Sequence, residues 1–212
     1  CSGGIDSTFL AYACVQSLGP ENVIILFGDS KLQAQTLRHT IEKRLSKELG
    51  TGVAVKKIPV DPFSQAAFVK NTKERCYLCK KHVYRQFLDY LHGLGIEVLL
   101  DGTNCDDLRE DRPGLKALEE LQVIKPLVQA GFHKHEIRLA AAEVGISYAN
   151  LPSNSCLATR IEPHHDIGED LLRSIEEMES FLHGRGYHGC RVRPRGETVV
   201  VEVIAEELER IT

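Results

Sequence analysis

The chain has 212 residues, of which 42% are hydrophobic and 26% charged, and its formal net charge is −4. This size allows one ordinary domain with a small added unit. The acidic balance argues against a broad surface for nucleic acid, and no apolar run is long enough to cross a membrane. We therefore expect a cytoplasmic protein that acts on small molecules.

The chain opens with the run CSGGIDS at residues 1–7. Its two glycines allow a tight turn, and the apolar residues from Ile5 to Ala13 recur at helical spacing. Because the first amides of a helix lack partners within it, such a turn is an anion site. It is not a Walker A loop, since no Gly-Lys pair occurs in the chain. We predict a helix over residues 5–18, ended by Gly19-Pro20.

This run resembles the Ser-Gly-Gly-x-Asp-Ser signature of the PP-loop (N-type ATP pyrophosphatase) superfamily. The resemblance implies an enzyme that binds the pyrophosphate end of ATP and leaves AMP on its substrate.

Strands and helices alternate after the first helix. We predict a strand at 23–27, a helix over about 31–49 capped by residues 28–30, and a strand at 53–60. This order indicates an α/β fold with a doubly wound parallel sheet. The strand that leads into the phosphate loop of such a sheet lies near its centre, so we expect that first strand to precede Cys1, outside this chain.

The middle of the chain continues this pattern. We predict short helical pieces in a loop over 61–74, a helix from Cys76 to about His92, strands at 96–100 and 123–124, and a helix over 133–144. The strand ends at Asp29 and at Asp101-Gly102-Thr103 should face the crevice above the phosphate loop. Mg²⁺ prefers oxygen ligands such as Asp6 and Asp101. The ATP site is therefore expected to comprise Ser2, Gly3, Gly4, Asp6, Ser7, Asp29, Asp101, Gly102 and Thr103.

The composition changes after Gly145. A long loop over 150–165 precedes a predicted helix at 168–182, strands at 190–193 and 198–204, and a helical end at 206–211. We divide the chain into a PP-loop domain, residues 1–160, and a small C-terminal α+β unit, residues 161–212. That unit is too small to bury much surface alone, so we expect it to pack on the first domain or on a neighbouring copy in a homo-oligomer.

The chain has seven cysteines, an odd number in a chain of this size. Disulfides are therefore disfavoured, and metal-binding or catalytic thiols are favoured. Cys76 and Cys79 form a Cys-x-x-Cys pair. A redox pair should follow a first strand, but residues 71–75 are polar. Zinc binding with His82, His164 or His165 and unligated thiols remain alternatives.

Five motifs occur in one order: SGGIDS, DGTNCDD, RPG, CLATR and RVR. Together they resemble the LarE family of ATP-dependent sulfur transferases over nearly the whole chain. The resemblance implies that ATP adenylylates a carboxylate of a pyridinium dicarboxylate mononucleotide and that sulfur then displaces AMP, in biosynthesis of the nickel-pincer nucleotide.

The resemblance also implies roles for single residues. Cys156 matches the family's sulfur-bearing cysteine, Arg160 the arginine just after it, and Arg191 and Arg193 a pair associated with the substrate phosphate. These arginines are expected to lower the pKa of a nearby thiol. The family has a one-cysteine form that gives up its own sulfur and a three-cysteine form with an iron–sulfur cluster. The set Cys76, Cys79 and Cys156 fits a 4Fe–4S cluster whose fourth iron is open to external sulfide.

We therefore expect a sulfur transferase whose partners are a small nucleotide and sulfide or another sulfur donor. Three alternatives remain. A tRNA thiolation enzyme of the same superfamily would need a strongly positive face, and an ammonia-using ligase such as an NAD or GMP synthetase would not need the three cysteines. A nucleotide-binding redox sensor would not turn over ATP.

Overall fold

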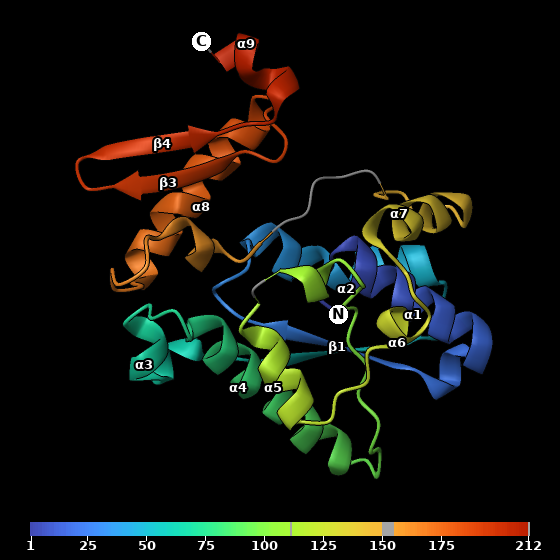
Figure 1. The fold of residues 1–212 in the computed structure, drawn as a ribbon. Coiled ribbons are helices and arrows are strands. Elements are labelled where there is room, and N and C mark those ends of the chain that lie inside the picture. Colours follow the sequence, from blue (N-terminus) through green and yellow to red (C-terminus); the bar gives the residue numbers. More distant parts are fainter. Residues whose placement is uncertain (111, 150–154, 212) are drawn as a thin grey trace.

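The computed structural model describes residues 1–110, 112–149 and 155–211 (Figure 1). Asp111 and residues 150–154 of the predicted loop lie outside the described residues. The helices are α1 Ile5–Leu18, α2 Gln35–Leu49, α3 Ala66–Val69, α4 Arg75–His92, α5 Gly114–Glu120, α6 Pro126–Gln129, α7 Lys134–Glu143, α8 Glu169–Gly184 and α9 Leu208–Ile211. The strands are β1 Ile24–Asp29, β2 Ala54–Pro59, β3 Arg191–Arg195 and β4 Thr198–Glu202.

Strands β1 and β2 form a parallel pair, in register from Ile24 opposite Ala54 to Asp29 opposite Pro59. Because successive side chains of a strand point to opposite faces, β1 is covered on both. Phe27 packs with residues of α1 and α2, while Leu26 packs with residues of α4. The α/β fold with a parallel sheet between helices is therefore confirmed.

The strand predicted at 96–100 is much shorter in the structure. Leu100 forms a single parallel bridge with Ile124, in which Ile124 N donates to Leu99 O at 3.0 Å and Asp101 N donates to Ile124 O at 2.9 Å. A longer ladder needs a partner strand along its length, and the 123–124 segment supplies one bridge only. The bridge nevertheless leads directly into Asp101.

The start of α2 also differs from the prediction. Residues 28–30 do not cap this helix, because Asp29 belongs to β1 and Ser30 Oγ accepts from Leu32 N at 3.3 Å. The helix begins at Gln35, whose backbone N–H donates to the carboxylate of Glu176 in α8. A residue distant in sequence therefore supplies the cap. Helix α5 was not predicted.

The C-terminal part consists of α8 packed on the antiparallel β3–β4 hairpin, gathered on one side of the α/β part (Figure 1). Its core continues into the α/β part, since Ile167, Leu172 and Ile175 share a buried cluster with Leu32 and Phe68. No helix within the described ranges is long and apolar enough to cross a membrane.

Candidate functional site

The phosphate loop is a compact turn held by its own hydroxyl groups. Gly3 has φ +77°, a conformation that glycine adopts without strain. Ser7 Oγ donates to Gly4 O at 3.1 Å and accepts from Ser2 N at 3.2 Å. No side chain caps the start of α1, so the amides of its first turn are available to an anionic ligand.

Asp6 faces this loop and pairs with Lys134, a residue that the sequence analysis missed. Lys134 Nζ donates to Asp6 Oδ2. The other carboxylate oxygen, Oδ1, is buried and has no hydrogen-bond partner in the described part of the chain. A buried carboxylate oxygen without a partner fits a hard cation such as Mg²⁺. Asp6 therefore retains a ligand atom for the predicted magnesium ion.

Lys134 is held in place by the segment that follows Asp101–Asn104. Asp106 accepts from Lys134 N at 2.8 Å and lies 2.7 Å from His133 Nδ1. The backbone N–H of Lys134 and the His133 ring hold the pKa of Asp106 below its ordinary value. These contacts orient the first turn of α7 so that its lysine reaches the loop.

Asp101 and Gly102 lie against the phosphate loop, as predicted. A Cβ on Gly102 would stand 2.9 Å from both N and Cα of Ser7, so only glycine permits this approach. The Asp101 carboxylate accepts from Thr103 N at 2.8 Å and from the Tyr84 hydroxyl, and Lys80 Nζ lies 3.4 Å away. Burial raises the pKa of Asp101, but Lys80 and these hydrogen bonds outweigh it and hold the pKa below its usual range. A magnesium ion bound to Asp101 would have to compete with these partners for the carboxylate oxygens.

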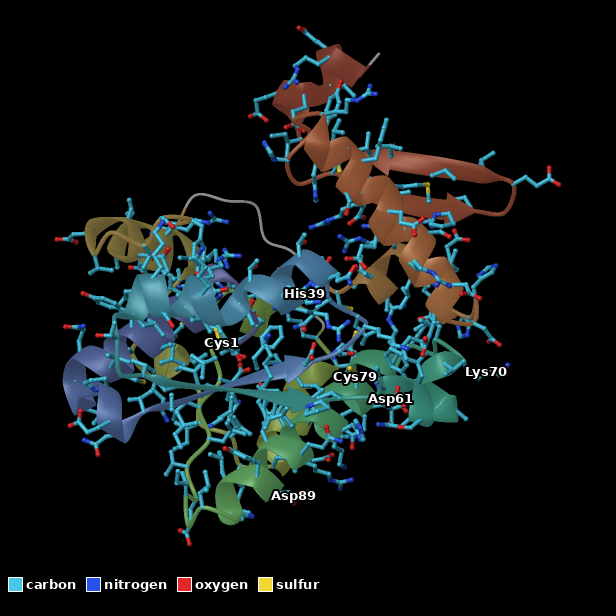
Figure 2. The ribbon with its side chains drawn as sticks, turned by 180° about the vertical axis from the view of Figure 1, so that it is seen from behind. Cys1, His39, Asp61, Lys70, Cys79 and Asp89 are labelled. Carbon is cyan, nitrogen blue, oxygen red and sulfur yellow. The ribbon has the colours of Figure 1, made fainter. Side chains whose placement is uncertain are left out.

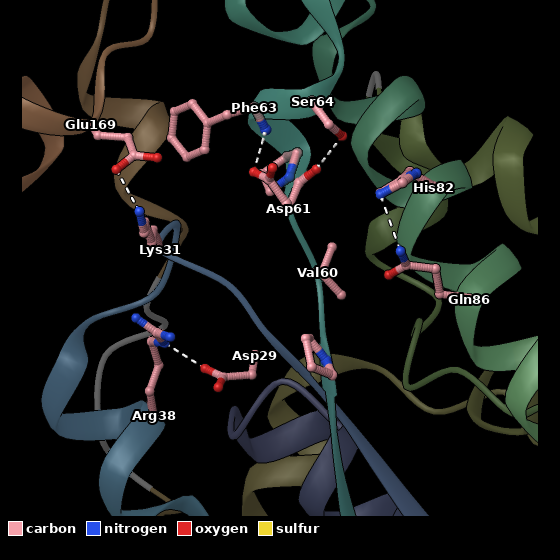
Figure 3. A pocket seen from close by; sticks show the side chains of 12 residues that line it. Asp29, Lys31, Arg38, Val60, Asp61, Phe63, Ser64, His82, Gln86 and Glu169 are labelled. Atoms are coloured by element: carbon pink, nitrogen blue, oxygen red, sulfur yellow. Dashed lines mark hydrogen bonds and ion pairs between the residues drawn. The ribbon is translucent and has the colours of Figure 1, made fainter.

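A pocket of about 400 Å³ opens at the carboxyl ends of β1 and β2 (Figure 3). Its walls carry two ion pairs, Asp29 with Arg38 at 2.5 Å and Lys31 with Glu169 at 2.5 Å. Asp29, predicted to bind ATP, lines this pocket. Glu169 brings the start of α8 to its rim. The full lining comprises Asp29, Lys31, Arg38, Pro59, Val60, Asp61, Pro62, Phe63, Ser64, His82, Gln86 and Glu169.

The structure brings Cys76, Cys79 and Cys156 together. Cys76 is exposed in the first turn of α4, while Cys79 and Cys156 are half-buried against one core cluster. Burial, with the nearby Cys156 and Cys76, raises the pKa of Cys79 to about 12. Figure 2 shows Cys79 and Asp61 on the side of the α/β part that faces the C-terminal unit. We define these three residues as the cysteine site.

Arg160, Arg191 and Arg193 were expected to lower the pKa of a nearby thiol; Arg160 acts in this direction on Cys190, where burial and carboxylates still raise the pKa, but none of the three is the cation that acts on Cys156. Burial and Cys76 raise the pKa of Cys156, and the guanidinium that opposes them belongs to Arg75. Arg160 and Arg193 are paired with carboxylates elsewhere.

Arg160 is a buried anchor of the turn that follows Cys156. Its Nε and Nη2 donate to the two oxygens of Glu179 at 2.8 and 3.0 Å. Its Nη1 donates to the Cys156 carbonyl at 3.2 Å, and the side chain is 2% exposed. Glu179 also accepts from Val192 N at 2.9 Å. The pair therefore ties Cys156 to α8 and β3.

Alternation along β3 places Arg191, Arg193 and Arg195 on one strand face. Arg193 donates to Thr159 O at 2.5 Å and to Glu202 at 2.6 Å. Arg195 lies 3.0 Å from Glu162. This face is therefore adjacent to the turn that carries Cys156.

One face of α4 joins the cysteine site to the phosphate loop. Cys76, Lys80 and Tyr84 are spaced four apart, which places them on one side of a helix. Lys80 and Tyr84 both contact Asp101. Helix α4 thus carries two of the three cysteines and both side chains that contact Asp101.

The described residues include no group of three or more His, Cys, Asp or Glu side chains placed to hold a single metal ion. This arrangement does not support the zinc alternative. Ligands of an iron–sulfur cluster bind separate iron atoms and need not converge on one point. Three neighbouring thiols fit such a cluster chemically.

Comparisons with known proteins agree with this site. Residues 1–106, which include the phosphate loop and Asp101–Thr103, match the sequence profile of the NAD synthase family. The chain belongs to this family of PP-loop ATP-using enzymes.

Within this class the chain is LarE-like, as its motifs predicted. It is 28% identical to the pyridinium-3,5-bisthiocarboxylic acid mononucleotide synthase of Lactiplantibacillus plantarum, over 95% of this chain and 72% of the relative. An uncharacterized protein of Methanocaldococcus jannaschii is 33% identical over 99% of this chain and 78% of its own length. A protein of Synechocystis, also uncharacterized, is 27% identical over 99% of this chain and 76% of its own length.

Proposed function

We propose that this enzyme adenylylates a carboxylate of a pyridinium dicarboxylate mononucleotide with ATP and then replaces AMP with sulfur. The observation that carries the proposal is that α4 bears Cys76 and Cys79 of the cysteine site together with Lys80 and Tyr84, the partners of Asp101. An ATP-using ligase that takes ammonia has no need of that arrangement. The printed name of the Lactiplantibacillus plantarum relative supports a thiocarboxylate product.

ATP would place its nucleoside in the pocket beside Asp29 and its phosphates on the loop from Ser2 to Ser7. The uncapped amides of α1 and the ammonium of Lys134 would bind phosphate oxygens. Asp6, with its free oxygen, would hold Mg²⁺, which supplies charge neutralisation on the pyrophosphate when bound. An acceptor carboxylate oxygen then attacks the α-phosphorus of ATP, and the bond to pyrophosphate breaks.

Residues 161–212 would bind the acceptor in this scheme. Arg191 and Arg193 suit its phosphate, because guanidinium groups bind phosphate oxygens bidentately. The sulfur attacks the acyl carbon, and the electron pair of the broken C–O bond leaves with AMP. Cys76, Cys79 and Cys156 would hold a 4Fe–4S cluster, which supplies an open iron for external sulfide. We propose a homo-oligomer, in which a neighbouring copy covers the exposed face of β4.

The test combines ATP, Mg²⁺, sulfide and the pyridinium dicarboxylate mononucleotide with anaerobically purified protein. We expect AMP and pyrophosphate, and a product with the mass change of oxygen replaced by sulfur. ADP and orthophosphate as main products would contradict the proposal. An amide formed with ammonia would support the ligase alternative, and a thiolated tRNA the nucleic-acid alternative.

The same preparation tests the cysteine site. Iron and acid-labile sulfide should be present, and the mass of the Cys156 peptide should be unchanged after turnover. Loss of the elements of H2S from that peptide would show instead that Cys156 is consumed.

A further inference from the structure

Arg75 carries a positive charge that has no role in the reaction proposed above. It occupies the first position of α4, directly before Cys76, and is half-buried. Its guanidinium donates to the side-chain oxygen of Asn71. No carboxylate in the described part of the chain lies within ion-pair distance of it. Because a partly buried cation without a counter-charge is costly, this position favours an anionic ligand.

Asn71 holds the Arg75 side chain in a fixed orientation. Asn71 is completely buried and has φ +51°, a conformation that is unfavourable for most residues other than glycine. The surrounding chain enforces it: Asn71 Nδ2 donates to Glu162 O at 2.7 Å, and Asn71 O accepts from His164 N at 3.0 Å. One of the five guanidinium N–H donors is therefore committed to a rigid amide, and the others have no partner among the described residues.

Arg75 lies one helical turn before Cys79 on α4, and Cys79 and Cys156 pack against the same core cluster. Burial and Cys76 raise the pKa of the Cys156 thiol, and Arg75 acts against both. Arg160 and Arg193 lie near the same turn, but each is paired with a carboxylate, Glu179 and Glu202 respectively. Arg75 is thus the cation best placed to receive a further negative charge beside Cys156.

We propose that Arg75, positioned by Asn71, binds the incoming sulfur as a hydrosulfide anion beside Cys156. This proposal rests on the sulfur transfer proposed above. In that step the hydrosulfide sulfur forms a bond to the acyl carbon, and the bond from this carbon to the phosphate oxygen of AMP breaks. AMP leaves with the electron pair, and the thioacid releases its proton to solvent.

The first test uses the full chain without a bound cluster and measures alkylation of Cys156 by iodoacetate, an anion, and by neutral iodoacetamide, read by peptide mass spectrometry. Both reagents attack the same thiolate, so the ratio of their rates reports anion binding and is independent of the thiol pKa. We expect Arg75→Met to lower the ratio about tenfold, the scale of one charge-assisted contact. Arg75→Lys should retain most of it. Lys73→Met, which removes an exposed cation two residues away, should leave it unchanged.

Equal ratios in the wild type and in Arg75→Met would overturn the proposal. In turnover assays Arg75→Met should raise the KM for sulfide and leave the KM for ATP unchanged. If only the KM of the acceptor rises, Arg75 binds the acceptor carboxylate and the proposal is wrong. Because alkylation requires no turnover, it gives an answer even where the sulfur-transfer assay fails. Thermal unfolding of each variant identifies any loss of fold. If Arg75→Met is unfolded, the alkylation ratio of Arg75→Lys is compared with that of the wild type instead.

Discussion

The phosphate loop and the turn after Cys156 hold their shapes through contacts of very different range. Ser2 and Ser7, whose hydroxyls lie 3.2 Å apart, are separated by five residues. The Cys156 turn depends instead on Glu179, 19 residues from Arg160, and on Arg193, 34 residues from Thr159. The turn of the phosphate loop is therefore encoded locally, whereas the turn after Cys156 depends on contacts with the C-terminal unit.

Removing Glu179 should have the largest effect on stability. Glu179→Ala leaves the buried Arg160 guanidinium without its partner, and breaking a buried pair in this way costs about 3–5 kcal/mol. Urea unfolding should show this loss, with Glu177→Ala, an exposed carboxylate on the same helix, as the control. The double variant Arg160→Met with Glu179→Leu should recover most of the stability. A Glu179→Ala protein as stable as the control would show that the turn is held by other contacts.

The Asp6→Asn substitution should affect the phosphate loop and leave the turn after Cys156 unchanged. The substitution preserves shape but removes the negative charge that would hold Mg²⁺, so AMP formation should fall at least about 100-fold. Thermal unfolding should remain close to that of the wild type. Asp89→Asn, at an exposed position of α4, serves as the control. Full activity of Asp6→Asn would remove Asp6 from the site.

The Arg191→Met substitution should distinguish binding of the acceptor from binding of ATP. We expect the KM of the acceptor to rise about 10- to 100-fold, the scale of a charged hydrogen bond to phosphate, with the KM for ATP unchanged. Arg173→Met, exposed on α8, is the matched control. Equal weakening of both ligands would contradict the assignment of this strand face to the acceptor.

Gly102→Ala tests the contact between the strand end and the loop. The new Cβ would meet the Ser7 backbone at 2.9 Å, and overpacking of this kind costs about 1–3 kcal/mol. Both unfolding midpoint and ATP affinity should fall. Gly168→Ala, where a Cβ meets nothing within 4 Å, should leave ATP affinity unchanged. Unchanged ATP affinity would mean that the loop tolerates displacement.

Tyr148→Phe should have the smallest effect. The Tyr148 hydroxyl donates to Thr8 Oγ1 at 2.7 Å in a buried position, and loss of one such bond costs about 0.5–1.5 kcal/mol. Urea unfolding should show that difference. Tyr12→Phe, which removes a hydroxyl without a hydrogen bond to the described residues, should show less. A reversed order would mean that the Tyr148 bond adds no stability.

The range of these contacts explains what the sequence could predict. The first helix, the parallel strand pair, the start of α4 and the approach of Asp101–Thr103 to the loop follow from glycine placement and hydrophobic periodicity. The contact of Lys134 with Asp6 could not be predicted, because it joins segments whose relative position depends on the fold. The spacing of Cys76, Lys80 and Tyr84 was a signal that could have placed Lys80 beside the site.

The cap of α2 has a consequence for any attempt to divide the protein. Glu176 accepts from Gln35 N, and Glu169 pairs with Lys31 at the rim of the pocket. A fragment that ended at residue 160 would lose both carboxylates and would expose Leu32 and Phe68 to water. The two parts are consecutive in sequence but are not independently stable. Excision of the C-terminal unit would weaken the nucleotide pocket as well as remove the strand face proposed to bind the acceptor.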